Sequence, residues 1–222
     1  MKNKATISAD IVSSTALSVE DRLFLEKEIS ELLKTLEQFF GKEAFYGRLI
    51  KGDYIECLFE KPKFALRAAL IIKSFVKSLQ LSQSEDSKQI KAFLEHGIKI
   101  AVSIGEIRIF DREKGIIDGE AIYLSGRAIN ELSSQKRGRT LVFRTNKSNY
   151  KVFDAVFDLL DVLFASFTRT QSKIVYYKLL GKSEKEITSI LSRAQSNINQ
   201  QVNSVGWRAI ENTVETFESI IK

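Results

Sequence analysis

The sequence has very little cysteine, histidine and proline, and each shortage excludes a kind of site. Cys57 is the only cysteine and His96 the only histidine among 222 residues. A disulfide framework, a thiolate zinc site and a multi-histidine metal site are therefore excluded within one chain. We expect Cys57 to be a small buried hydrophobe in a strand and His96 to be a structural residue. The single proline, Pro62, fits the start of a helix.

Long apolar runs are also missing. No stretch approaches the run of about 18 apolar residues that a membrane helix needs, and residues 1–10 lack the apolar centre of a signal peptide. We therefore expect a cytoplasmic protein without a membrane partner. Lys and Arg number 34 against 28 Asp and Glu, a net charge of +6. This excess favours an anionic partner such as a nucleotide or a nucleic acid, with a merely soluble surface as the alternative.

Two aspartates follow apolar runs in the first quarter of the chain. The run Ala5 to Thr15, ATISADIVSST, alternates like a strand and carries Asp10 at its end. The run Arg48 to Phe59, RLIKGDYIECLF, is interrupted at Gly52, which predicts a hairpin turn beside Asp53. Carboxylates suit Mg²⁺ or Mn²⁺, which keep their other positions for water and substrate phosphates. We predict that both aspartates share such a cation; the alternative is that each caps a turn or a helix.

The spacing of apolar residues along 1–144 predicts alternating helices and strands. The expected elements are a strand at 5–10, a five-turn helix from Ser18 to near Gly41, a hairpin at 44–59, a helix at 64–79, a polar connector at 81–89, two strands within 97–110 broken near Gly105, a charged turn at 111–118, a helix at 121–132, a basic loop at 136–139 and a strand at 140–144. This order indicates an α+β sandwich, ferredoxin-like in outline, with one sheet covered by helices.

Three segments of this region resemble the signature segments of the class III nucleotidyl cyclase catalytic domain. They are SADIVSST with Asp10, IKGDYIECLF with Asp53, and GEAIYLSGR from Gly119 to Arg127. The resemblance covers residues 4 to about 144 in the family's order and spacing, and it implies a nucleotidyl cyclase-like fold. It also implies that Asp10 and Asp53 bind the metal ions that hold a nucleoside triphosphate. Arg127 would stabilise the charge that develops on the transferring phosphorus.

The positions that read the base and the ribose in that family carry other residues here. Leu49 stands where the family has a base-reading lysine, Ile116 where it has that lysine's partner aspartate, and Tyr123 where it has the ribose-orienting asparagine. The resemblance thus implies a nucleotide site that keeps its phosphate and metal half and has lost its base and ribose half. Because lost alignment can lower rates by about 10² or more, we do not expect an efficient purine cyclase. For Arg127 the alternative is an ion pair with Glu131 on a helix surface.

From Asn149 onward the pattern is helical throughout. We divide the chain into a nucleotidyl-cyclase-like domain (1–144), a connecting helix (145–167) and an all-α domain (168–222). The spacing within the last part predicts a helix at 168–180, a short helix at 183–191, a turn at 192–194, a longer helix after it and a final helix at 207–221. Helix, short helix, turn, longer helix is the order of a helix-turn-helix.

The segment GKSEKEITSILSRAQSNINQQV resembles the helix-turn-helix of bacterial regulators and sigma factor C-terminal regions. Amide side chains can pair with adenine in the major groove, and cations can meet phosphates. The candidate DNA-binding residues are Lys182, Lys185 and Arg193 for phosphates, and Gln195, Ser196, Asn197, Asn199, Gln200 and Asn203 for bases. The alternative is a helical bundle whose polar face is solvated or contacts protein.

These features predict a homodimeric DNA-binding transcriptional regulator whose degenerate cyclase-like domain senses a nucleotide or a metal ion. Dimerisation is expected because cyclase-like sites resemble shared interfaces and helix-turn-helix modules usually read two half-sites. An active nucleotidyl cyclase of unusual base preference is the first alternative. A pair of protein-interaction scaffolds is the second.

Overall fold

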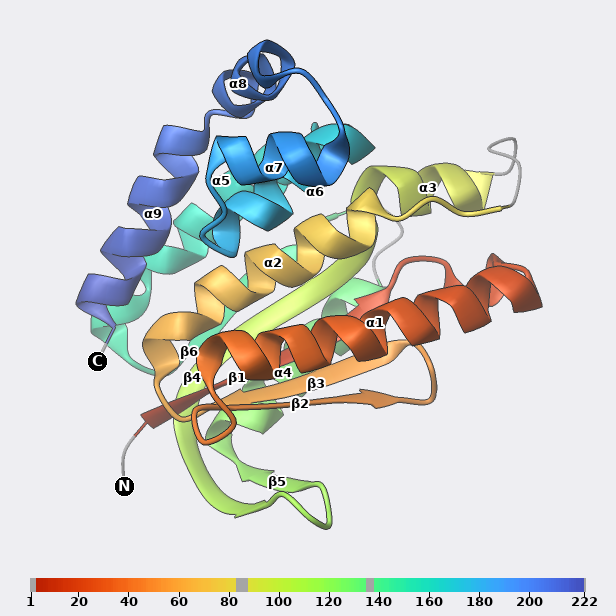
Figure 1. The fold of residues 1–222 in the computed structure, drawn as a ribbon. Coiled ribbons are helices and arrows are strands. Elements are labelled where there is room, and N and C mark those ends of the chain that lie inside the picture. The colour runs from red at the N-terminus through yellow and green to blue at the C-terminus, as the bar shows by residue number, and fades with distance from the viewer. Residues whose placement is uncertain (1–2, 83–87, 135–137, 222) are drawn as a thin grey trace.

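The described residues, 3–82, 88–134 and 138–221, form a curled sheet covered by helices in this computed structural model (Figure 1). The strands are β1 (Asn3–Ile11), β2 (Phe45–Ile50), β3 (Tyr54–Phe59), β4 (Ile98–Asp111), β5 (Ile116–Gly119) and β6 (Leu141–Thr145). The α-helices are α1 (Val19–Phe40), α2 (Ala65–Ser78), α3 (Lys88–His96), α4 (Glu120–Ser134), α5 (Val152–Ala165), α6 (Arg169–Leu179), α7 (Glu184–Leu191), α8 (Gln195–Ser204) and α9 (Trp207–Ile220), and the short 3₁₀ helices are η1 (Ser14–Ala16), η2 (Pro62–Phe64) and η3 (Ser148–Tyr150). None of the helices described here is long and apolar enough to cross a membrane.

The sheet has the order β2-β3-β1-β4-β5, and β6 lies beside β4. All neighbours are antiparallel except β4 and β6, which run parallel. The prediction of a mixed structure with one helix-covered sheet is confirmed. β1 is a central strand, since it pairs with β3 along one edge and with β4 along the other. Its residues Ala5 to Ala9 are buried on both faces of the sheet.

The prediction of two strands broken near Gly105 is wrong. β4 is one strand of 14 residues, and Gly105 pairs with Lys4 of β1 in unbroken register. The irregularity falls later, between Ile107 and Ile109, where β4 leaves β1 and continues with β5. The predicted charged turn at 111–118 is correspondingly shorter, because β5 already begins at Ile116.

The side-chain period of β1 separates two different faces of the sheet. Ala5, Ile7 and Ala9 belong to the main hydrophobic core under α1 and α2. Thr6 and Ser8 point to the opposite face, where the hydroxyl of Ser125 on α4 contacts both, at 3.0 Å and 2.9 Å. Asp10 follows the same alternation and therefore lies on the α4 face.

The ends of the first helices agree with the sequence signals. The Ser18 hydroxyl accepts a hydrogen bond from the Asp21 backbone N–H at 3.0 Å, and α1 has 22 residues, about one turn more than expected. Pro62 opens η2, which leads directly into α2. The sequence pattern does not predict helix α3, because the polar stretch 81–89 overlaps its start at Lys88. Residues 83–87 of the predicted polar connector lie outside the described residues. Residues 136–137 of the predicted basic loop at 136–139 lie outside them as well.

The C-terminal helices pack on the sheet part instead of standing apart from it. α5 lies against β6, α6 against α2 and α9 against η2. The Phe217 ring of α9 lies 4.8 Å from that of Phe153 and 6.1 Å from that of Phe143, and Arg67 forms an ion pair with Glu218 at 2.6 Å. One hydrophobic cluster runs through both parts. The division into domains, with 145–167 as a connecting helix, stays a prediction.

A buried lysine ties α2 to β6 and α5. The Lys73 ammonium has no exposed surface and donates a hydrogen bond to the Thr140 hydroxyl at 2.6 Å. It also lies 3.4 Å from the Asp161 carboxylate, which accepts hydrogen bonds from the backbone N–H and the hydroxyl of Thr140. Burial lowers the pKa of Lys73, and the charge of Asp161 opposes that shift. Lys73, Thr140 and Asp161 thus satisfy one another's polar groups within a contact that is otherwise apolar.

Candidate functional sites

Asp10 lies at the end of β1, opposite Tyr54 of β3 and Lys99 of β4. Its carboxylate is partly buried and accepts a hydrogen bond from the Ser133 hydroxyl of α4 at 3.2 Å. Burial raises the pKa of Asp10, and the charge of Asp53 raises it further. The Ser133 hydrogen bond and the Lys99 charge act in the opposite direction. Asp53 and Lys99 thus both contribute to the electrostatic environment of Asp10.

Asp53 occupies the loop between β2 and β3, as the sequence predicts. In this loop Lys51 and Gly52 both have positive φ, 54° and 81°. The Asp53 carbonyl accepts a hydrogen bond from the Ile11 backbone N–H at 3.2 Å, which holds the loop beside the end of β1. The Ser14 hydroxyl of η1 donates to the Asp53 carboxylate at 2.8 Å. Both aspartates are thus fixed by hydroxyl groups from different elements.

A small cavity of about 260 Å³ adjoins Asp53, and Ser14, Arg22 and Lys51 also line it. Ligand pockets usually have 300 to 1,000 Å³, so this space suits phosphate groups better than a whole nucleotide. Its lining carries two cations, Arg22 and Lys51, and two carboxylates, Glu26 and Asp53.

The donor set at Asp10 and Asp53 fits a hard divalent cation with few protein ligands. Mg²⁺ in nucleotide sites is held by one or two carboxylates together with water and substrate phosphates. Within the part of the chain that the structure describes, no group of three or more His, Cys, Asp or Glu side chains gathers as a metal site. A cage formed by the protein alone is therefore not present there.

Arg127 lies on the outer side of α4 and is exposed. Its guanidinium has no hydrogen-bond or ion-pair partner among residues 3–82, 88–134 and 138–221. The alternative ion pair with Glu131 does not form, because Glu131 lies 3.9 Å from Arg144 instead. Within one copy of the chain Arg127 therefore contacts neither Asp10 nor Asp53.

The three positions expected to face a base do not gather in one cavity. Leu49 pairs with Ile55 and packs on the core beside α1, so it lies on the face of the sheet opposite Asp10. Ile116 is exposed at the start of β5. The Tyr123 hydroxyl donates a hydrogen bond to the Asp118 carboxylate. A base-binding role for these positions stays a prediction.

The α7–turn–α8 segment has the order that the sequence predicts. Ser183 and Glu186 form a capping box at the start of α7, and Ser192 ends that helix with φ 50°. α8 packs on α6 and α7 through Ile198 and Val202. Figure 1 shows α8 at the end of the molecule away from the sheet.

All nine candidate DNA-binding residues are exposed: Lys182, Lys185, Arg193, Gln195, Ser196, Asn197, Asn199, Gln200 and Asn203. Several have partners within the protein. Lys182 forms an ion pair with Glu186 at 3.0 Å, and the Asn199 amide donates to Glu184 at 3.2 Å. Arg193 lines a cavity shared with α1, α2 and α6. Contact with DNA stays a prediction for the whole set.

The sequence reasoning missed Ser14, Ser133 and Lys99, which surround the aspartates. Ser14 follows the first strand directly, so its place near Asp53 could have been suspected from the hydroxyl-rich ending of that segment. Lys99 and Ser133 carry no local signal, because only the register of β4 and the placing of α4 bring them to Asp10.

No protein-family model matches the chain, and no curated protein matches it. Among solved structures, the chain is similar in fold to a bacterial light-regulated adenylyl cyclase, with 20% identity, coverage of 64% of this chain and 74% of that chain, and a TM-score of 0.46. A second structure of such a cyclase shows 19% identity, 64% and 42% coverage, and a TM-score of 0.45. The guanylyl cyclase Cya2 shows 13% identity, 66% and 87% coverage, and a TM-score of 0.39.

Proposed function

We propose that this protein is a homodimeric DNA-binding regulator whose sheet region, cyclase-like in its sequence segments, binds a nucleotide through a divalent cation. The observation that carries the proposal is the row of exposed amide side chains on α8. Ile198 and Val202 hold that helix on α6 and α7. The opposite side, with Gln195, Asn199 and Gln200, stays open to solvent.

This surface has the chemistry for reading adenine-containing sites. Asparagine and glutamine can make paired hydrogen bonds to adenine in the major groove, whereas lysine binds phosphates without reading sequence. Asn199 would exchange its hydrogen bond to Glu184 for one to a base. Lys182 is held in an ion pair with Glu186, whereas Lys185 has no ion-pair partner within the described part of the chain, so Lys185 is the stronger phosphate candidate.

A selection from random duplex DNA should enrich a sequence with two half-sites. Replacing Gln200 with alanine should then weaken binding to that sequence by about 1 to 3 kcal/mol and relax one base position. Lys185→Ala should weaken binding to all sequences alike and reduce the salt slope by about 1. Lys34→Ala, on the exposed side of α1, is the matched control and should change neither. Equal binding to every sequence, or no binding, contradicts the proposal.

The cation site should show its own pH dependence. Protons compete with the cation for Asp10, and burial raises the pKa of that carboxylate. Affinity for Mn²⁺ should therefore fall on acidification, beginning at a higher pH than for a solvated aspartate. Titration calorimetry of Mn²⁺ between pH 5 and 8 with Asp10→Asn, expected to weaken binding about tenfold or more, measures this. Asp118→Asn, on an aspartate paired with Arg108, should leave the affinity unchanged.

A nucleotidyl cyclase of unusual base preference is the second candidate. The position of the Asp53 loop beside the end of β1 and the exposure of Arg127 favour it, because an outward arginine could serve the site of a second copy in a dimer. Incubation with each of the four nucleoside triphosphates and Mg²⁺ or Mn²⁺ tests it, with Asp10→Ala and Arg127→Ala as inactive controls. No cyclic product from any triphosphate removes this candidate.

A further inference from the structure

A cavity of about 610 Å³ lies where the sheet part meets the C-terminal helices. Its walls come from α1, the end of α2, the first turns of α6 and the turn before α8. The volume is within the range of pockets for small organic ligands. Its lining contains neither Asp10 nor Asp53, and it contains none of the exposed amide side chains of α8.

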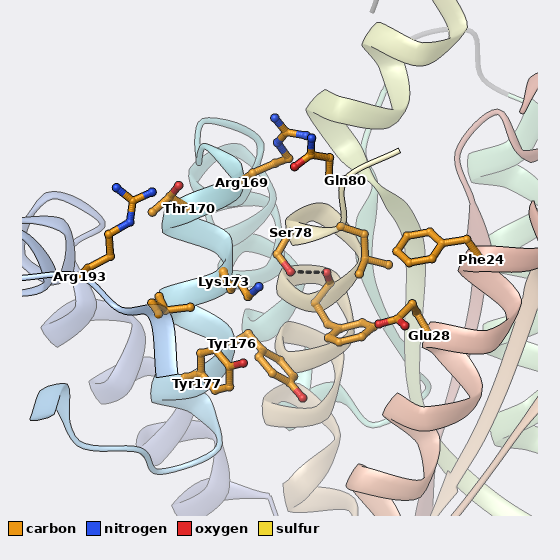
Figure 2. A pocket seen from close by; sticks show the side chains of 13 residues that line it. Phe24, Glu28, Ser78, Gln80, Arg169, Thr170, Lys173, Tyr176, Tyr177 and Arg193 are labelled. Carbon is orange, nitrogen blue, oxygen red and sulfur yellow. Dashed lines mark hydrogen bonds between the residues drawn. The ribbon is translucent and has the colours of Figure 1, made fainter. Parts of the chain in front are cut away.

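Three cations line this cavity: Arg169 and Lys173 on α6, and Arg193 in the turn before α8. Figure 2 shows Arg193 at one edge of the cavity, Arg169 near Gln80, and Lys173 between Arg193 and Glu28 of α1. No hydrogen bond or ion pair holds any of these three cationic groups within the part of the chain that the structure describes. The cavity therefore has an excess of positive charge, opposed by a single carboxylate.

Aromatic rings form the other wall. Phe24, Phe75, Tyr176 and Tyr177 all line the cavity. The ring centres of Phe75 and Tyr176 are 5.1 Å apart, and those of Tyr176 and Tyr177 are 5.0 Å apart. These three rings therefore pack against one another. Such a wall can hold a flat ring, and unpaired guanidinium groups suit phosphate oxygens, which they can bind in pairs.

We propose that this cavity binds a small phosphorylated aromatic compound of the nucleoside monophosphate class. The ring lies against Tyr176, Tyr177 and Phe75, and the phosphate is attracted by the positive charge that Arg169, Lys173 and Arg193 bring to the cavity lining. Glu28 accepts hydrogen bonds from hydroxyl or amino groups of the same ligand. This site is separate from the cation site at Asp10 and Asp53.

A ligand bound in the cavity can also influence the proposed DNA-binding surface, because Arg193 belongs to the turn before α8. Arg193 lies two positions before Gln195, the first residue of α8. It directly follows Ser192, which ends α7 with φ 50°. A phosphate in the cavity holds the Arg193 guanidinium there and fixes the turn against α6. The bound ligand thereby changes DNA affinity, a consequence that rests on the proposed function, whereas ligand binding itself does not.

Titration calorimetry in EDTA with adenosine and guanosine monophosphates, adenosine alone and inorganic phosphate alone tests the site. EDTA removes the cation that binding at Asp10 and Asp53 requires. We expect at least one monophosphate to bind at micromolar concentration, and adenosine and phosphate to bind at least tenfold more weakly. Lys173→Gln and Arg193→Gln should each weaken monophosphate binding at least tenfold.

The matched controls are Lys178→Gln, on the same helix but outside the cavity, and Asp10→Asn, and both should bind like the original protein. Thermal melting without ligand checks that each variant folds, which is expected because Lys173 and Arg193 are exposed. Absence of binding below millimolar concentration overturns the proposal. Binding that survives both cavity substitutions but is lost in Asp10→Asn also overturns it and leaves the proposed function intact.

Discussion

Replacing Lys73 with alanine should lower the free energy of unfolding by about 3 to 5 kcal/mol. The substitution leaves the Asp161 carboxylate buried without its partner cation and removes the hydrogen bond to Thr140. It also empties space in the contact between α2, β6 and α5. Chemical denaturation followed by circular dichroism measures the change.

Two comparisons separate the charge effect from the loss of side-chain volume. Lys73→Met removes the charge and keeps most of the side-chain volume. Adding Asp161→Asn to Lys73→Met should recover more than half of the unfolding free energy that Lys73→Met loses, because no unpaired charge then stays buried. Lys34→Met removes a lysine whose side chain is 67% exposed beside Glu31, and it should stay within about 0.5 kcal/mol of the original protein. A loss for Lys73→Ala as small as that of Lys34→Met would show that the buried pair does not hold these elements together.

Gly119→Ala should lower the free energy of unfolding by about 1 to 3 kcal/mol. Gly119 joins β5 to α4 with φ 148°, a backbone conformation that residues with a Cβ rarely adopt. A Cβ there would lie 2.5 Å from the Glu106 carbonyl oxygen and 2.7 Å from the Ile107 Cα, and neither backbone atom can yield easily. Thermal unfolding measures the effect.

Gly126→Ala is the control for this substitution, since it lies in the adjoining helix. A Cβ at Gly126 meets nothing within 4 Å, and alanine is the better helix former by about 1 kcal/mol. This variant should therefore unfold at an equal or higher temperature. If both variants behave alike, the close approach of β4 to Gly119 is not what requires glycine.

The local elements were predictable because their signals lie within a few residues of each other. Ser18 and Ser183 mark helix starts through bonds to residues three positions on, and Gly52 marks the turn beside Asp53. The break expected at Gly105 was wrong for a related reason. A glycine in a strand indicates either a turn or a close approach, and here the close neighbour is Glu120 of α4.

The surroundings of the aspartates depended on information that no short segment carries. Lys99 reaches Asp10 through strand register, and Ser133 reaches it because α4 covers that face of the sheet. Likewise, a lysine within the apolar spacing of α2 gives no sign that it is buried. Only its meeting with Asp161, far along the chain, allows Lys73 to lose its water.

The sequence alone determined the helices other than α3, most of the strands, the positions of Asp10 and Asp53 beside their turns, and the row of polar residues on α8. Periodicity, capping and turn chemistry act locally, so they can be read locally. The tertiary structure decided the outward position of Arg127, the buried Lys73–Asp161 pair and the cationic cavity between α1, α2 and α6. These features depend on packing between segments far apart in the chain, where burial and charge are set by neighbours that the sequence does not place.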